Sequence, residues 1–298
     1  MGTFFKQIYR YTRPRRYRHN ENLWPYVRIT RASEGHITSL RLRGQQVPIV
    51  NLSDLRGKYS GDLLLVASGP SVNQTDFAPL QQMPAMGVNG SWFLQDRASF
   101  RFYIIVDMTF IDQRLSMVSE MIKDPQILFF TTVHGIVKII DHFGFSAIRC
   151  QVAIIEDACF KIFQPKLWPE EIHLQYQNEA SISFSAKNEN IAFAHDIRKG
   201  IFDAATVVYW ALQVIHFMGF NRVVIAGLDM NNFQQPRFYE NEHDCSPSYL
   251  ESKFNELIEP AFKHASGVFN NEKREVLNLS LNSALDSSIF KKVSSNDL

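Results

Sequence analysis

Cysteine is scarce in this sequence. The chain of 298 residues has three, Cys150, Cys159 and Cys245, and no two of them form a CxxC pair. This scatter argues against a disulfide framework and against a zinc site built on cysteines, and it fits a reducing compartment.

Long apolar runs are also lacking. No segment reaches the roughly 18 consecutive apolar residues that are needed to cross a bilayer. The N-terminus has charges and aromatic side chains but no apolar centre, so it is not a secretory signal. We therefore expect a soluble, cytoplasmic protein.

No charge sign dominates, and several nucleotide motifs are missing. The 31 basic and 30 acidic residues give a net charge of +1, which argues against nucleic acid as a partner. Neither GxGxxG nor GK[ST] occurs, so a Rossmann dinucleotide site and a P-loop are unsupported. There is no Asp-x-Asp motif, and no carboxylate cluster has ligand spacing, which predicts a site without metal or cofactor.

The stretch 62–74, DLLLVASGPSVNQ, has the pattern of a buried strand that ends in a glycine turn. Ser71, followed three residues later by Gln74, matches the capping box that opens a helix. Free N–H groups at such a turn form an anion site in open α/β folds. The alternative is an ordinary exit from strand to loop.

Strand and helix patterns alternate from position 61 onward, which predicts an α/β fold with a Rossmann-type, mostly parallel sheet flanked by helices. The expected strands are 63–67, 85–88, 102–106, 126–131, 150–155, 222–226 and 276–279, and the expected helices are 110–122, 137–143, 203–218 and 250–265. Residues 156–199 are interpreted as a long loop or an insertion.

Two parts of the chain differ in composition. Residues 1–60 are expected to form a basic, aromatic N-terminal extension with a small hairpin in 27–50, and residues 61–298 the main domain. Within the main domain, residues 230–250 are polar and aperiodic and are interpreted as a mobile flap over the site. We call residues 230–250 the flap.

Polar residues follow several expected strands. Ser68, Asn89 and Asp107 each end one, and such strand ends converge on one crevice. Gly227, Leu228 and Asp229 end a fourth. Asp229 either accepts hydrogen bonds from a bound base or sugar or caps the next turn.

The flap offers groups for phosphate departure and proton transfer. Without a cation, a leaving phosphate needs protein donors, and Arg237 and Tyr239 are suited to this, or else to packing the flap. For a general base, His243 has a suitable ordinary pKa, and Glu240 is the second candidate. Thr206, near a helix start, is a candidate for binding a substrate carboxylate.

Residues 1–26 interleave arginines with aromatic side chains. This composition is typical of a segment that lies on an anionic membrane surface. It also fits packing on the protein body with wet guanidinium groups, or RNA binding.

Five motifs together resemble the WaaZ-type Kdo (3-deoxy-D-manno-octulosonic acid) transferases of the lipopolysaccharide core. They lie at 66–71 (VASGPS), 88–91 (VNGS), 225–229 (IAGLD), 236–239 (PRFY) and 277–280 (LNLS). More distantly, the Gly-Pro-Ser loop and the Gly-x-Asp block are similar to bacterial sialyltransferases of the Campylobacter type. The match covers about 61–280, and 203–250 is its most specific part.

The resemblance implies a GT-A-like fold, a CMP-activated keto sugar acid as donor, inversion at the anomeric carbon and no metal. It places Ser68, Gly69, Ser71 and Asn89 on the CMP phosphate and ribose, with Asp107 near the donor. It also places Gly227, Leu228 and Asp229 on cytosine and ribose, Thr206 on the donor carboxylate, Arg237 and Tyr239 on the leaving phosphate, and the base at His243 or Glu240.

The implied acceptor is a sugar of the lipid A–core oligosaccharide. The enzyme would then act as a peripheral protein on the inner face of the bacterial inner membrane, held to the anionic surface through residues 1–26. Two other functions stay open: a CMP-sialic acid-dependent sialyltransferase, and a non-catalytic nucleotide-binding partner in core assembly.

Overall fold

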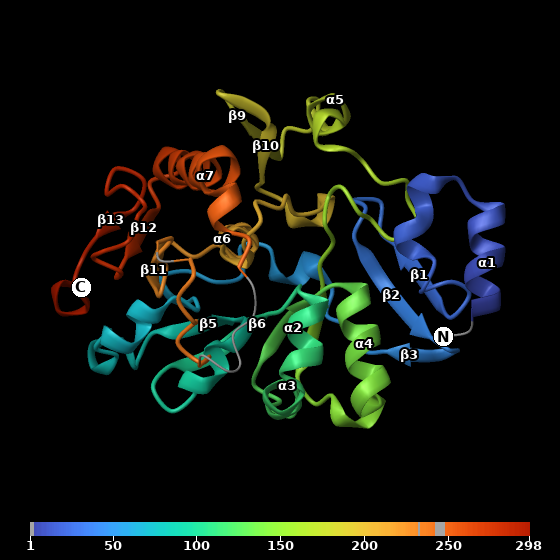
Figure 1. Ribbon diagram of the computed structural model, residues 1–298, viewed down its shortest axis with the longest axis horizontal. Helices are drawn as coiled ribbons and strands as arrows, with labels where there is room; N and C mark the ends of the chain where they lie inside the picture. Colours follow the sequence, from blue (N-terminus) through green and yellow to red (C-terminus); the bar gives the residue numbers. More distant parts are fainter. Residues whose placement is uncertain (1–2, 232, 242–247) are drawn as a thin grey trace.

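The computed structural model describes residues 3–231, 233–241 and 248–298, and an eight-stranded sheet forms its centre (Figure 1). The strand order is β13-β12-β11-β4-β5-β6-β7-β8, and each pair of neighbours is parallel. The strands are β4 (Asp62–Val66), β5 (Pro84–Val88), β6 (Ser99–Ile104), β7 (Leu128–Thr131), β8 (Gln151–Ile154), β11 (Arg222–Ala226), β12 (Glu275–Asn278) and β13 (Lys291–Lys292). The predicted α/β class and parallel sheet are confirmed.

The central strands are apolar on both faces because helices cover both (Figure 1). In β4, Leu63 and Leu65 belong to one core cluster and pack with α6 (Val207–Met218) and α7 (Glu259–Asn271). Leu64 and Val66 belong to the opposite cluster, with α2 (Met108–Gln113), α3 (Leu115–Met121) and α4 (Val133–Phe143). The alternation of side chains along β4 thus divides the core into two layers.

The N-terminal extension lies at the opposite end of the molecule from the C-terminus (Figure 1). It contains α1 (Thr3–Thr12), the 3-10 helix η1 (Arg15–Asn20) and an antiparallel sheet of β1 (Val27–Arg31), β2 (Ile37–Leu42) and β3 (Gln45–Val47). The predicted hairpin therefore has a third strand. Its buried residues Leu23, Ile37 and Leu40 join the core cluster that contains α4.

Several predicted helix boundaries are wrong. The helix expected at 110–122 is divided at Arg114, whose backbone (φ −124, ψ 41) leaves the helical region and separates α2 from α3. The helix expected from Asp203 begins at Val207, because Asp203 bonds Ala205 N–H at 3.0 Å and Ala205 has a positive φ of 58. The helix expected at 250–265 opens with 3-10 and π-helical turns (Glu251–Lys253 and Phe254–Ile258) and runs on in α7 to Asn271.

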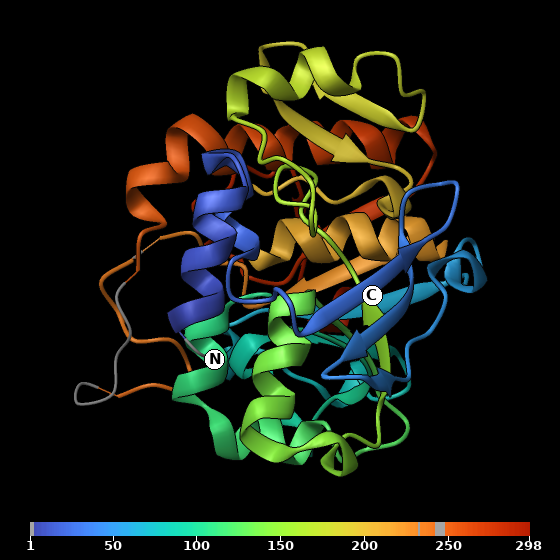
Figure 2. The same ribbon diagram turned by 90° about the vertical axis from the view of Figure 1, so that its right-hand side faces the viewer.

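Residues 156–199 are more ordered than a long loop. They form α5 (Ile172–Tyr176) and an antiparallel pair, β9 (Ile182–Ser185) and β10 (Asn188–Ala194). Figure 2 shows this layer above α7. In the sequence, the polar residues at the start of β10 obscure the strand pattern of its apolar end. In the structure, Phe193 in this end is fully buried, and its ring meets the Phe269 ring of α7 edge to face at 6.1 Å.

Among the described residues, no helix is long and apolar enough to cross a membrane.

Candidate active site

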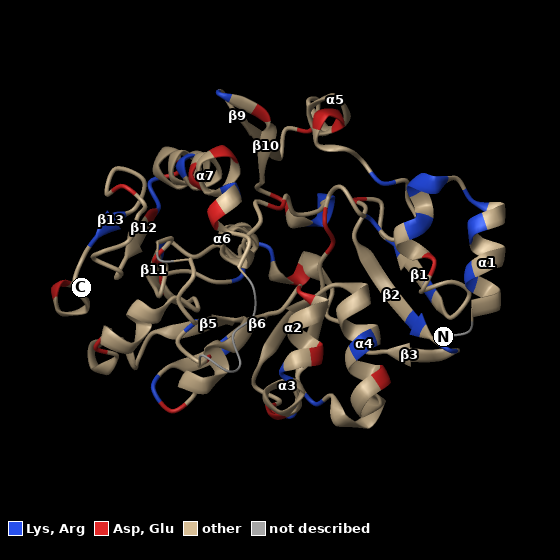
Figure 3. Cartoon of the chain, viewed as in Figure 1, with Lys and Arg blue, Asp and Glu red and all other residues tan. Residues whose placement is uncertain are grey.

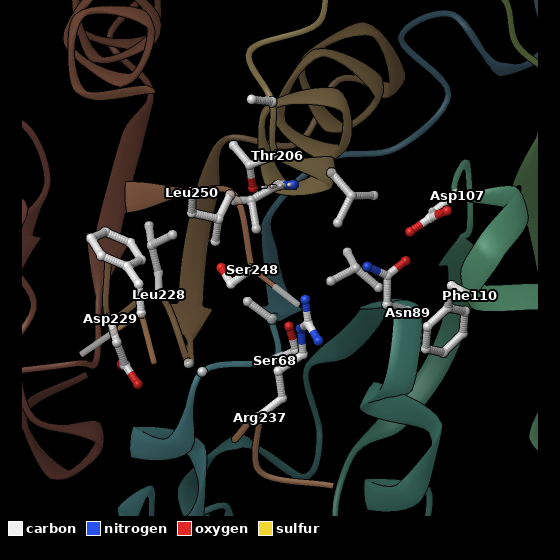
Figure 4. A pocket seen from close by; sticks show the side chains of 18 of the residues that line it. Ser68, Asn89, Asp107, Phe110, Thr206, Leu228, Asp229, Arg237, Ser248 and Leu250 are labelled. Atoms are coloured by element: carbon white, nitrogen blue, oxygen red, sulfur yellow. Dashed lines mark hydrogen bonds between the residues drawn. The ribbon is translucent and has the colours of Figure 1, made fainter. Parts of the chain in front are cut away.

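A cavity of about 750 Å³ lies at the carboxyl ends of β11, β4, β5 and β6 (Figure 4). We call it the main cavity. Its lining includes eleven of the thirteen residues that the sequence suggested: Ser68, Gly69, Asn89, Asp107, Thr206, Gly227, Leu228, Asp229, Arg237, Tyr239 and Glu240. The predicted convergence of strand ends is therefore confirmed. The roles assigned to the individual residues stay predictions.

The other two of the thirteen residues are Ser71 and His243. Ser71 does not line the cavity and instead supports its floor. His243, proposed as a base, lies outside the described residues, as do its flap neighbours Glu242 and Asp244.

Asp229 holds the loop after β4 by contacts with Ser71. One carboxylate oxygen, Oδ2, accepts Ser71 N–H at 2.9 Å, and the other, Oδ1, accepts the Ser71 hydroxyl. The Ser71 hydroxyl also meets the Ser280 hydroxyl at 2.7 Å. The carboxylate of Asp229 is therefore engaged within the protein, and it caps the turn at Ser71 rather than the next turn along the chain.

The capping-box prediction for Ser71 and Gln74 is wrong. The segment Pro70–Gln74 is a short 3-10 helix whose N-cap is Gly69, without a side-chain cap. Gly69 N–H donates to Gly227 O at 2.9 Å, and Ser71 N–H donates to Asp229. These two N–H groups of the turn, where free N–H groups were expected, thus already have protein partners.

Gly69 allows the loops after β4 and β11 to touch. A Cβ at this position would lie 2.6 Å from Gly227 O and 2.5 Å from Asp229 Oδ2. Gly227 itself has a φ of +77, which favours glycine. The resemblance motif 277–280 also supports this contact, since Asn278 Nδ2 donates to Leu228 O at 3.1 Å.

Asn89 turns its side chain into the main cavity (Figure 4). Its backbone is in the left-handed region, with φ 46, which asparagine tolerates better than most residues. The Tyr103 hydroxyl fixes this turn by donating to Asn89 O at 2.6 Å. Among the described residues, the buried Asn89 Oδ1 has no hydrogen-bond partner. An oxygen in this position is suited to accept a hydrogen bond from a ligand.

Two helices begin at the wall of the main cavity. Thr206 is the N-cap of α6, and its hydroxyl accepts Val208 N–H at 3.4 Å. Val207 and Val208, in the first turn of α6, also line the cavity. Asp107 is the N-cap of α2 and accepts Thr109 N–H at 2.8 Å. The N-terminus of the twelve-residue helix α6 is a favourable position for an anionic group.

The described part of the flap brings Arg237 into the cavity, where its guanidinium projects between Ser68 and Asn89 (Figure 4). The Glu240 carboxylate accepts Arg237 Nη1–H at 2.7 Å through Oε1 and Arg237 N–H at 2.9 Å through Oε2. The Glu240 side chain is only 2% exposed. These contacts favour a role for Glu240 in positioning Arg237.

The Tyr239 ring packs against two aromatic side chains from outside the flap. Its ring stacks on Phe93 at 5.8 Å and meets Phe110 edge to face at 6.2 Å. A Cβ at Gly90 would lie 2.2 Å from this ring. Burial raises the pKa of Tyr239 above its ordinary value, so its hydroxyl stays protonated at neutral pH and can donate a hydrogen bond.

Two cationic residues of the cavity were missed in the sequence. The Arg114 guanidinium lies 5.6 Å from the centre of the Tyr239 ring, and Lys253 lines the cavity beyond the flap. Arg114 was assigned to the middle of a continuous helix, where it would have been an ordinary surface residue. The break between α2 and α3 directs it to the cavity, and no local pattern in the sequence marks this break.

One group of side chains in the described part of the chain has a spacing that suits a metal ion: His195, His216 and Glu272. None of them lines the main cavity. Arg274 Nε approaches Glu272 Oε2 at 3.2 Å and competes with a cation for this carboxylate.

Two solved structures of the sialyltransferase CstII show a low overall likeness to this chain. One, of the enzyme from Campylobacter jejuni, is described as a complex with a substrate analogue, cytidine-5'-monophosphate, at 11% identity and a TM-score of 0.41, covering 78% of this chain and 85% of that one. The other contains a trisaccharide acceptor and CMP, at 11% identity and a TM-score of 0.39, covering 78% and 86%. A likeness this low does not place a ligand in the present cavity.

Two curated relatives are each named a probable 3-deoxy-manno-octulosonic acid transferase. The protein from Escherichia coli strain K12 is 24% identical over 213 residues, which cover 66% of this chain and 70% of that protein. The protein from Salmonella typhimurium strain LT2 is 23% identical over 250 residues, which cover 80% and 88%.

Residues 48–296 match the family described as 3-deoxy-D-manno-octulosonic acid transferase WaaZ. The matched range contains the whole parallel sheet and every residue that lines the main cavity. The resemblance found in the five motifs is thereby confirmed. The chain belongs to the WaaZ family of Kdo transferases and is a glycosyltransferase that acts on Kdo.

Proposed function

We propose that this enzyme transfers Kdo from CMP-Kdo to a sugar of the lipopolysaccharide inner core, with inversion and without a metal ion. The observation that carries the proposal is the main cavity, whose wall contains Arg237, Tyr239 and Asn89 together with the residues at the N-terminus of α6. Its volume of about 750 Å³ is sufficient for a nucleotide sugar.

The chemistry requires little beyond charge stabilisation and one proton acceptor. A keto sugar linked to CMP dissociates toward an oxocarbenium ion, and negative charge develops on the departing phosphate. Hydrogen-bond donors fixed in a site that excludes water stabilise that charge. Arg237 and the protonated Tyr239 hydroxyl are the donors that we assign to the phosphate, and Arg114 adds positive charge beside them.

The carboxylate of the keto acid fits the start of α6. Thr206 lines the cavity with Val207 and Val208 of the first turn of this helix, and the helix dipole favours an anion there. The loops at 68–71 and 227–229 and the side chain of Asn89 would then hold the nucleotide, with Asp107 near the donor sugar. In this arrangement the backbone of 227–229 contacts the base and ribose, while the Asp229 carboxylate holds Ser71.

Metal independence is the next part of the proposal. In metal-dependent transferases a divalent cation stabilises the charge of the leaving phosphate, and here we assign this role to arginine side chains. No cofactor beyond the activated donor is then required, and we expect transfer to persist in excess EDTA.

The N-terminal extension supports the proposed location of the enzyme at the membrane. Figure 3 shows lysine and arginine concentrated on α1 and η1. Tyr9 is buried, and Phe5 meets Trp24 at 6.0 Å, so part of the aromatic set packs on the protein body. Phe4 and Tyr11 are 67% and 91% exposed, and they would contact the inner face of the inner membrane, where the lipid A–core acceptor is anchored.

The double variant Arg237→Gln with Tyr239→Phe tests the proposed donor site. Removing one such donor lowers kcat by about 10²–10³-fold, so the double variant should show almost no turnover of CMP-Kdo. The measurement is release of CMP from CMP-Kdo and from CMP-Neu5Ac, with core oligosaccharide present and with EDTA added.

The matched control is Arg101→Gln with Tyr59→Phe, two positions outside the cavity, which should retain the parent rate. Turnover of CMP-Neu5Ac in preference to CMP-Kdo would contradict the donor assignment and favour a sialyltransferase. A folded double variant that still supports normal core structure in cells would favour a non-catalytic partner.

A further inference from the structure

A second cavity, of about 370 Å³, lies beside the main cavity at the same edge of the sheet. Its wall includes Val106 after β6, Thr132 after β7 and Ile155 after β8. The main cavity occupies the ends of β11, β4, β5 and β6, so the two cavities follow one another along the strand order.

The two cavities share three residues: Val106, Asp203 and Trp210. Asp203 and Trp210 are hydrogen-bonded to each other, with Trp210 Nε1–H donating to Asp203 Oδ1 at 2.7 Å. Both lie beside Thr206 and the start of α6. A keto sugar acid carries its carboxylate on the anomeric carbon, so a donor carboxylate at α6 would bring the reacting carbon close to this shared wall.

The second cavity has the side chains expected of a sugar site. Aromatic rings offer flat apolar surfaces, and carboxylate and imidazole groups hydrogen-bond hydroxyls. The lining side chains of these kinds are His19, His134, Glu156, Asp157, Phe160 and Trp210.

The N-terminal extension forms part of this wall. His134 Nε2 meets His19 O at 2.9 Å, and His19 Nε2 meets Lys161 O at 3.0 Å. Asn20 Oδ1 accepts Phe163 N–H at 3.1 Å and holds η1 against the loop after β8. The segment proposed to lie on the membrane is therefore joined to the second cavity.

The carboxylates of this cavity differ in their surroundings. Glu156 is bound by Arg31, whose Nη2–H donates to Oε1 at 2.7 Å, and it also accepts Ile162 N–H at 2.9 Å. Asp203 accepts Trp210 Nε1–H and Ala205 N–H. Asp157 accepts Cys159 N–H at 2.6 Å through Oδ1. Burial raises the pKa of Asp157 to about 7, and the negative charge of Asp203 contributes to the rise.

We propose that the second cavity holds the acceptor sugar and that the Asp157 carboxylate takes the proton from its attacking hydroxyl, an inference that rests on the proposed function. The hydroxyl oxygen forms a bond to the anomeric carbon of Kdo, and the bond from that carbon to the phosphate oxygen breaks. The electron pair of the broken bond leaves with CMP, and the hydroxyl proton passes to Asp157. The base then lies in the loop after β8 rather than in the flap.

Two variants test this assignment. In steady-state assays with CMP-Kdo and deacylated core oligosaccharide from a strain that lacks this transferase, Asp157→Asn should lower kcat by about 10²–10⁴-fold. Phe160→Ala, at a position 39% exposed, should raise the acceptor KM by about tenfold and change kcat less. Both variants should bind CMP with the parent affinity in titration calorimetry. Asp112→Asn and Leu174→Ala, outside both cavities, are the controls.

The pH profile adds a second readout. The base must be deprotonated, so kcat/KM should fall below about pH 7, and this acidic limb should be absent in Asp157→Asn. The titratable groups around Asp157 are Glu156, Cys159, Tyr176 and Asp203, together with His19 and His134, which line the same cavity. Burial lowers the pKa of both histidines, which moves their titration away from the pH expected for Asp157.

The outcomes separate this inference from the proposed function. A parent protein that neither binds CMP nor releases it from CMP-Kdo would overturn the donor site itself. If the parent transfers Kdo, a parent-like kcat in Asp157→Asn or an unchanged acceptor KM in Phe160→Ala would overturn the acceptor assignment alone. A loss of CMP affinity in both variants would also overturn it, by placing the second cavity within the donor site.

Discussion

Gly69 lies at the point where the loop after β4 meets the loop after β11. Its N–H donates to Gly227 O, and the neighbouring Ser71 is held by Asp229. Two loops that are more than 150 positions apart in the sequence thus form one floor for the main cavity. The contact is close enough to leave no space for a side chain at Gly69.

We expect Gly69→Ala to lower the free energy of unfolding by about 1–3 kcal/mol, because the added methyl group would overlap Gly227 O and Asp229 Oδ2. Urea unfolding followed by circular dichroism measures this change. Gly267→Ala is the matched control. It lies inside α7 with open space around the new Cβ, and it should raise the stability by about 0.5–1 kcal/mol. A Gly69 variant as stable as its parent would refute the close contact.

The residues at the strand ends could be predicted because each follows an apolar run within a few positions. Ser68, Asn89 and Asp229 are examples, and all three line the main cavity. Their hydrogen bonds could not be predicted, since the partners of Asp229 and Glu240 depend on how loops meet in space. Arg114 and Asp157 carry no local signal, and only the packing of the chain brings them to the cavities.

At the scale of elements, α6 connects the proposed donor and acceptor positions. Its N-cap, Thr206, lines the main cavity, and Trp210, one turn further on, borders both cavities. The rest of the helix is buried between the sheet and α7. Sequence periodicity was sufficient to identify this helix. The start was misplaced because the turn at 203–206 uses a positive φ at Ala205 that the pattern does not show.

The basic face of α1 and η1 leads to a prediction about membrane binding. Arg13, Arg15 and Arg18 are exposed, and each basic residue contributes on the order of 1 kcal/mol at an anionic surface. Replacing all three by glutamine should therefore weaken binding to vesicles that contain phosphatidylglycerol by about 10²-fold, as measured by sedimentation.

The control for this experiment replaces three exposed lysines elsewhere, Lys123, Lys187 and Lys273, by glutamine. It removes the same charge and should change vesicle binding far less. Equal effects of the two triple variants would show that net charge, and not the N-terminal segment, determines binding.

At the scale of the whole molecule, one edge of the parallel sheet carries both cavities. The order β11-β4-β5-β6 underlies the main cavity, and β6-β7-β8 underlies the second. The strand pattern of the sequence was sufficient to predict this sheet and its functional edge. The second cavity was not predictable, because His19 comes from the N-terminal extension and Asp157 from a segment interpreted as a loop.

The small layer of α5, β9 and β10 shows why residues 156–199 were misjudged. β10 begins with polar residues and ends in the apolar run Ile191–Ala194, which is buried. The alternation of polar and apolar residues along β10 is incomplete, because the first half of the strand is exposed to solvent and the second half lies in the core. Single-sequence patterns identify strands best when one environment extends over the whole strand.

The most direct test of the account is the position of CMP in a crystal structure of this protein. We expect the nucleotide between the loops 68–71 and 227–229, with its phosphate within hydrogen-bond distance of Arg237 and Tyr239 and without a metal ion beside it. The second cavity should stay open toward that phosphate. CMP bound elsewhere on the molecule, or a phosphate held by a cation, would contradict the central claim.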